Sequence, residues 1–144
     1  MDTRRRGRPV TELASTLTPR EIASQAARAI AVLNDLTHGG GELSNPGDVR
    51  DIVRSLELIG QGLPQLCEQL ARFLVVQQED GQLTNTDGLD CGDSLTEVIE
   101  ALAAAGQAAD MMTAALTEAR AASQALTPAR HRGWEGRADA DSRA

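Results

Sequence analysis

Apolar residues recur at alternating spacings of three and four between residues 46 and 79. This spacing places them on one face of an α-helix as a continuous apolar seam. The seam consists of Val49, Ile52, Leu56, Ile59, Leu63, Leu66, Leu70 and Phe73, and it is widened by Val53, Cys67 and Leu74. The pattern predicts one long helix over residues 46–79 with a surface suited to another helix.

A second seam with the same period predicts a helix over about residues 95–127. Its members are Leu95, Val98, Leu102, Ala105, Ala109, Met112, Leu116, Ala119, Ser123 and Leu126. Alanines alternate with bulky side chains along this seam, and small residues let two helix backbones approach closely. We therefore expect the two long helices to pair antiparallel as a hairpin.

A shorter first helix is predicted over residues 19–37. Thr18 and Glu21 have the spacing of a capping box, and Pro19 suits the first helical position. Three consecutive glycines, residues 39–41, should end the helix. The fold class is therefore all-α: a long antiparallel hairpin with a shorter third helix laid alongside, which makes a three-helix bundle.

Two further start signals divide the remaining chain. Asn45 and Asp48 flank Pro46 before the middle helix, and Ser94 precedes the last helix in the manner of a capping box. Pro64 lies inside the middle helix, where a proline costs roughly 3 kcal/mol and kinks or breaks it. The seam passes this proline without losing phase, which favours a kink near residues 60–64 over a reversal of direction.

The predicted bundle spans residues 18–127, between two polar segments. Residues 1–17 form an Arg-rich tail that we expect to be flexible, and residues 128–144 form a tail that we expect to be disordered. Because the first helix is shorter than the other two, it leaves part of the seam uncovered. An uncovered apolar seam favours association with another helical protein or with a second copy of the chain.

Charge is distributed unevenly along the 144 residues. The formal net charge is −7, with 14 basic and 21 acidic residues, and every basic residue is Arg. Residues 18–127 contain six Arg and sixteen acidic residues. Such an acidic surface is unsuited to a phosphate backbone, so any nucleic-acid binding must use the tails.

Cysteine usage and hydropathy indicate a cytoplasmic protein with no membrane contact. The two cysteines, Cys67 and Cys91, do not form the framework expected of a secreted disulfide-rich domain. The basic residues near the start precede no apolar run like that of a signal peptide. No stretch approaches the ~20 apolar residues of a membrane span.

Residues suited to catalysis are scarce, and we expect no enzymatic activity, cofactor or metal. His38 and His131 have no Cys or acidic neighbours at a metal-ligand spacing. Acidic residues gather between 80 and 93, but aligning Gly88 with the glycine of a calcium-binding EF-hand loop places Leu83 at a required ligand position. We interpret this segment as a solvated acidic loop.

The N-terminal tail contains the motif Arg6-Gly7-Arg8-Pro9, preceded by Arg4 and Arg5. The motif resembles the core of the AT-hook, a short segment that lies in the minor groove of A/T-rich DNA. Glycine lets the backbone enter a narrow groove, and arginines are attracted by its negative potential. The resemblance implies weak DNA contact through Arg4, Arg5, Arg6 and Arg8.

Two other resemblances concern the rest of the chain. Trp134-Glu135-Gly136 resembles the tripeptide of the secreted Trp-X-Gly helical hairpins, although their tripeptide lies between two helices; Trp134 is otherwise an anchor on the bundle or a residue of the tail. The middle helix, from Pro46-Gly47-Asp48-Val49 through Leu63-Pro64-Gln65 to Ala71-Arg72-Phe73-Leu74, precedes an Ala-rich helix. This arrangement resembles small helical proteins of unknown function from high-GC actinobacteria, often found beside genes of mobile elements.

Two functions are therefore expected as alternatives. The first is a non-enzymatic interaction module that self-associates or docks on a partner through the seam. The second is a DNA-associated accessory protein of a mobile element that uses the N-terminal arginines.

Overall fold

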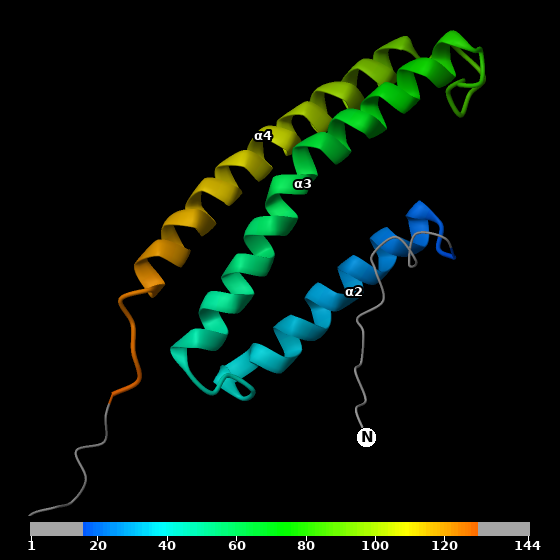
Figure 1. Cartoon of the computed structure of the whole chain (residues 1–144). Helices are drawn as coiled ribbons and strands as arrows, with labels where there is room; N and C mark the ends of the chain where they lie inside the picture. Colours follow the sequence, from blue (N-terminus) through cyan, green and yellow to red (C-terminus); the bar gives the residue numbers. More distant parts are fainter. Residues whose placement is uncertain (1–15, 130–144) are drawn as a thin grey trace, which may run out of the picture. The chain divides into compact units, whose positions relative to one another are not determined.

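The computed structural model describes residues 16–129, and this part of the chain is all-helical (Figure 1). Its elements are α2 (Pro19–Thr37), the short 3-10 helix η1 (His38–Gly40), α3 (Pro46–Glu79) and α4 (Gly92–Ser123). The chain divides after Leu43 into two compact units, Met1–Leu43 and Ser44–Ala144, each described below by itself. The segment 18–127, predicted as one bundle, is thus shared between two units, and the packing of the first helix on the hairpin stays a prediction.

Helix α2 begins at the capping box expected from the sequence. The backbone N–H of Glu21 donates to the Thr18 hydroxyl at 3.3 Å, and the Thr18 N–H donates to the Glu21 carboxylate at 2.8 Å. The bond from the Thr18 N–H, followed by a bond at 2.9 Å from the Thr18 hydroxyl to the same carboxylate, lowers the pKa of Glu21. The helix ends at Thr37, and Gly39 follows with a φ of 67°, a conformation that glycine adopts without strain.

Helix α3 has the bounds expected from the sequence and is continuous through Pro64. The Asn45 side chain accepts from the Gly47 N–H at 2.7 Å, and Asp48 accepts from the Asn45 N–H at 3.0 Å. Figure 1 shows α3 changing direction near its middle, where Pro64 lies. The helix is therefore bent there and not broken, because tertiary packing retains the turn that a proline disfavours.

Helix α4 differs from its expected bounds at both ends. It begins at Gly92 instead of Leu95, so the predicted cap at Ser94 is wrong. The Leu95 N–H already donates to the Cys91 carbonyl at 2.8 Å, and Asp90 accepts from the Gly92 N–H at 3.2 Å. After Ser123 the chain makes only tighter bonds between residues three apart, so regular α-helix ends ahead of residue 127.

Helices α3 and α4 lie side by side and antiparallel (Figure 1). Near the open end of the hairpin, Glu57 of α3 contacts Thr117 and Arg120 of α4. At mid-length, a Cβ placed on Gly106 would lie 3.5 Å from the Pro64 Cα. This pairing is the long hairpin predicted from the two seams.

The loop between α3 and α4 is held by its own polar side chains. Asp87 accepts from the Leu89 N–H at 3.0 Å, and the Asn85 amide donates to the Asp90 carbonyl at 2.8 Å. Gly81 and Gly88 take positive φ angles within it. Carboxylates in this loop therefore serve local turns, which agrees with the solvated acidic loop expected from the sequence.

Candidate protein-interaction surface

The two helices meet along a row of α3 residues in which each member follows a residue of the predicted main seam by one position. We call the α3 and α4 residues on this line the contact line. All of them are buried or half-buried. On α3 they are Val53, Glu57, Gly60, Pro64, Cys67, Ala71 and Leu74, and on α4 they are Leu95, Ile99, Leu102, Gly106, Ala109, Thr113, Leu116, Arg120 and Ser123. Spacings of four and three alternate along both sets, as in a coiled coil.

Small residues explain why the helices meet on this line. Gly60 and Gly106 both lie on it and are both buried. A Cβ on Gly60 would collide with the Thr113 hydroxyl, and a Cβ on Gly106 would touch Pro64 and Cys67. The backbones therefore approach closely where the side chains are small, and the bulky seam of α3 is displaced to one side.

The predicted seam of α3 is consequently only partly covered. Ile52, Leu56 and Leu63 are half-buried. The other five members, Val49, Ile59, Leu66, Leu70 and Phe73, are between 42% and 59% exposed. Half-exposed bulky side chains in one row along a helix are typical of a surface that binds another protein.

Helix α4 adds exposed apolar side chains to the same side of the hairpin. Val98 is 44% exposed and Met112 is 41% exposed. Each lies one position before a contact-line residue, as Ile59 and Leu66 do on α3. On each helix, the residue one position before the contact line is rotated by about 100° from it. Because the two helices are antiparallel, this rotation brings the exposed row of α3 and the exposed row of α4 to the same side of the hairpin. The proximity of the Met112 methyl to Gly60, 3.0 Å from a Cβ placed there, agrees with this placement.

We define the apolar face of the hairpin by its six half-exposed members. They are Ile59, Leu66, Leu70, Phe73, Val98 and Met112. No seam position from Ile59 to Phe73, or from Val98 to Ala119, carries a charge. The apolar face is therefore suited to close contact with a second apolar surface, because no charge would lose its water there.

A polar cluster inside the hairpin was not expected from the sequence. Glu57 is 7% exposed, and its carboxylate accepts from the Thr117 hydroxyl and from the Arg120 Nε, both at 2.7 Å. The Thr117 bond, followed by the Arg120 bond, lowers the pKa of Glu57. A shift of one helix along the other would leave this carboxylate buried and unpaired, so the cluster favours one register.

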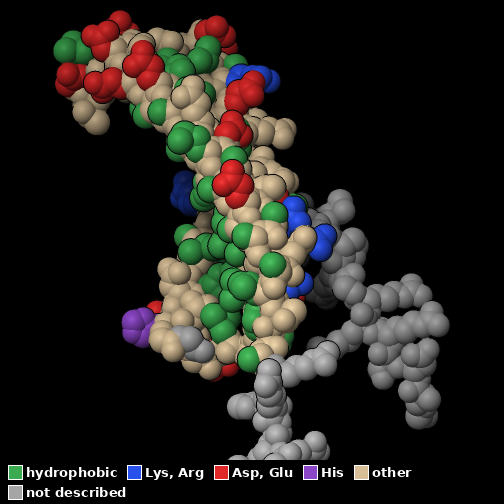
Figure 2. Space-filling model, turned by 90° about the vertical axis from the view of Figure 1, so that its left-hand side faces the viewer, with side chains coloured by type: hydrophobic (Ala, Val, Ile, Leu, Met, Phe, Trp, Pro, Cys, Tyr) green, Lys and Arg blue, Asp and Glu red, His purple; other side chains and the backbone are tan. Residues whose placement is uncertain are grey.

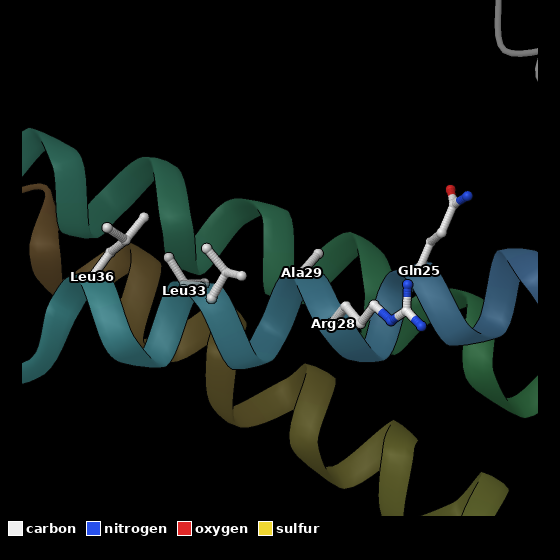
Figure 3. A pocket seen from close by; sticks show the side chains of 6 residues that line it. Gln25, Arg28, Ala29, Leu33 and Leu36 are labelled. Atoms are coloured by element: carbon white, nitrogen blue, oxygen red, sulfur yellow. The ribbon is translucent and has the colours of Figure 1, made fainter.

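Helix α2 carries an apolar side of its own, and none of its residues is buried. Figure 3 shows Ala29, Leu33 and Leu36 on one side of the helix, where they line a shallow hollow with Gln25 and Arg28. In proteins, most of the stability of a helix comes from packing of its apolar side. The apolar side of α2 is therefore a second surface suited to helix packing.

The residues considered for other chemistry lie apart or outside the described part. Arg4, Arg5, Arg6 and Arg8 fall outside the described residues, as does Trp134. Between residues 16 and 129, no three His, Cys, Asp or Glu side chains are grouped as a metal site. None of the helices in that range combines the length and hydrophobicity that a bilayer-spanning segment requires.

No protein-family model matches the chain, and no curated protein or solved structure matches it significantly.

Proposed function

We propose that this chain is a non-enzymatic helical interaction module that self-associates through the apolar face of the hairpin. The observation that carries the proposal is the exposure of Ile59, Leu66, Leu70 and Phe73 in one uncharged row. Two such faces packed together would make a four-helix bundle, a stable way for two helical hairpins to bury a shared seam.

Charge favours an antiparallel arrangement of the two copies. Residues 61–111, which form the half of the hairpin nearest the loop, contain nine acidic residues and one Arg. Carboxylates gather at this end in Figure 2. A two-fold axis across the middle of the apolar face would keep the two acidic ends apart and so reduce their repulsion.

The expected affinity is modest. Covering a half-exposed Leu, Ile, Val, Met or Phe contributes roughly 1 kcal/mol, half the gain of full burial. The six side chains of two faces then supply about 12 kcal/mol, against roughly 4–15 kcal/mol lost when two proteins associate. We therefore expect reversible association in about the micromolar range or weaker.

Matched double variants test the proposal. Leu66→Ser/Leu70→Ser removes apolar area from the face, whereas Leu58→Ser/Val76→Ser removes it from exposed positions elsewhere on α3. Sedimentation equilibrium should show that the first pair weakens association and the second does not. Equal effects of the two pairs, or none, would contradict self-association through this face, and a monomeric wild-type protein would direct the search to a different helical partner.

The free thiols support a reducing, cytoplasmic setting for this module. Cys67 is half-buried, Cys91 is buried, and the two do not form a disulfide with each other. Disulfides are rare where thiols are kept reduced.

The Arg-Gly-Arg-Pro motif supports a second candidate function, that of a DNA-associated accessory protein of a mobile element. The remainder of the chain is acidic, so contact would be restricted to Arg4, Arg5, Arg6 and Arg8. Gel-shift titrations with A/T-rich duplex should show weak binding that falls with salt and disappears when residues 1–10 are deleted. Undiminished binding by the deletion variant would refute this candidate.

A further inference from the structure

A groove lies between α3 and α4 on the side of the hairpin away from the apolar face. Its volume is about 360 Å³, and its charged lining residues are Glu68 and Asp110. At about 100° per residue, Glu68 lies on the opposite side of α3 from Leu66, two positions before it. Asp110 lies on the opposite side of α4 from Met112 for the same reason. The groove is therefore separate from the surface proposed for self-association.

Small residues leave the groove open along two to three helical turns. Gly106 has no side chain, and Ala71 and Ala103 project only a methyl group each. The lining covers residues 64–71 of α3 and 99–110 of α4, which are rises of about 11 Å and about 17 Å at 1.5 Å per residue. An amphipathic helix presents apolar side chains one turn apart, about 5.4 Å, and can place two or three of them within that length. A third helix is therefore a suitable occupant.

The charge around the groove favours a basic occupant. Residues 61–111 hold nine acidic residues and one Arg, whereas residues 44–60 and 112–123, the other half of the hairpin, hold four acidic residues and three Arg. That one Arg, Arg72, is already paired with Glu68 at 2.6 Å. Between residues 16 and 129, Asp110 has no salt-bridge partner. The groove thus lies in the half of the hairpin whose negative potential attracts cations.

The described helices of this chain lack the charge that the groove favours. Helix α2 carries two Arg and two acidic residues, α3 carries three Arg and five acidic residues, and α4 carries one Arg and five acidic residues. A helix from a second copy would therefore bring no net positive charge to the groove. Charge complementarity points to a different protein as the source of the helix.

We propose that the groove binds a basic amphipathic helix of another protein. The apolar side chains of that helix enter between α3 and α4, over Ala71, Ala103 and Gly106. Its arginines or lysines lie near Glu68 and Asp110. The hairpin and its partner helix then form a three-helix bundle, and the apolar face on the other side stays free for self-association.

A synthetic peptide provides the probe. It has roughly 18 residues, about five helical turns, with leucines at spacings of three and four on one side and arginines on the other. A control peptide carries Glu in place of each Arg. The full chain is used in the Leu66→Ser/Leu70→Ser background, so that the apolar face does not contribute. Fluorescence anisotropy of the labelled peptides should show saturable binding of the arginine peptide and no binding of the glutamate peptide.

Two neighbouring exposed alanines give a matched pair of variants. Ala103 lines the groove, whereas Ala104 does not. Ala103→Arg should raise the dissociation constant of the arginine peptide at least about tenfold, because the new side chain fills the groove and repels the peptide. Ala104→Arg changes the net charge equally and should raise the constant by no more than about threefold. Circular dichroism should be unchanged in both variants.

A second pair of variants removes one carboxylate each. Asp110 lines the groove, whereas Glu97 is exposed on α4 and does not line it. Asp110→Asn should weaken binding of the arginine peptide more than Glu97→Gln does. These exposed sites lie outside the contact line, so this pair also tests the groove if Ala103→Arg disturbs the fold.

Three results would overturn the proposal. The first is the absence of saturable binding of the arginine peptide. The second is equal weakening within each pair of variants, which would mean that the peptide responds to the overall charge of the chain and not to the groove. The third is equal binding of the arginine and glutamate peptides, which would exclude recognition of a basic helix.

Discussion

Replacing Gly60 and Gly62 by alanine tests where the two long helices meet. The glycines lie two residues apart within α3, and alanine is favoured over glycine in a helix by about 1 kcal/mol. Gly60 is buried on the contact line, whereas a Cβ added at Gly62 has no heavy atom within 4 Å. The two substitutions therefore share the same gain in helix propensity and differ only in the atoms that the new methyl group contacts.

At Gly60 the methyl group meets two side chains of α4. The Met112 methyl, 3.0 Å away, is the end of a flexible chain and can move. The Thr113 hydroxyl donates to the Ala109 carbonyl at 2.8 Å, so turning it away loses about 1 kcal/mol. If the new methyl group also forces the helices apart, the free energy of unfolding falls further, by about 1–3 kcal/mol, which is the usual cost of overpacking.

We expect Gly62→Ala to raise the free energy of unfolding by about 1 kcal/mol. The free energy of unfolding of Gly60→Ala should be lower than that of Gly62→Ala by about 2 kcal/mol or more. Urea titrations followed by circular dichroism measure both, provided that the slope against urea is unchanged. Gly106→Ala provides an intermediate control, because its Cβ would meet Pro64 at an ordinary contact distance of 3.5 Å. Equal stabilisation by Gly60→Ala and Gly62→Ala would refute the proposed contact line.

Three further substitutions address the bend, the exposed seam and the buried carboxylate. Pro64→Ala should preserve the fold and raise the urea midpoint, because an interior proline costs a helix about 3 kcal/mol; a lower midpoint would mean that its contact with Gly106 is worth more than the lost hydrogen bond. Leu70→Asp should abolish association while changing stability by no more than about 0.5 kcal/mol, as expected at an exposed site; collapse of the melting transition would place Leu70 in the hairpin core. Because the pKa of Glu57 is lowered on folding, its contribution to stability is present above its ordinary value of 4.5 and is lost as pH falls through the folded pKa. Thermal melts of Glu57→Gln should therefore depend less on pH in that acidic range, and an unaltered pH dependence would exclude Glu57 as the cause.

Periodicity predicted the helices well but placed the contact one residue away. On α3, Ile59 and Gly60 belong to two parallel rows that both repeat every three and four residues, so the period alone does not distinguish the rows. The sequence analysis took the row with the larger side chains as the main seam and included Val53, Cys67 and Leu74 of the other row only as residues that widen it. The structure uses the row with Gly60 and Cys67, because backbone proximity depends on the smallest residues facing each other.

Local signals were reliable where side chain and backbone were adjacent in the chain. Thr18 and Asn45 cap their helices as expected, but Ser94 does not, because Asp90 and the Cys91 carbonyl satisfy the first amides of α4. The pairing of Glu57 with Arg120 spans 63 positions of sequence. No periodic or capping signal specifies such a distant partner, although a lone Glu on a line of apolar and small residues indicates that one exists.

The mass in solution of the wild-type protein tests the central proposal most directly. Light scattering behind a sizing column, over a dilution series from millimolar to nanomolar protein, gives the mass without assuming a shape. If the apolar face mediates self-association, the mass should rise from that of one chain to that of two, with a midpoint in about the micromolar range or above it. A mass that stays at one chain throughout the series would contradict it.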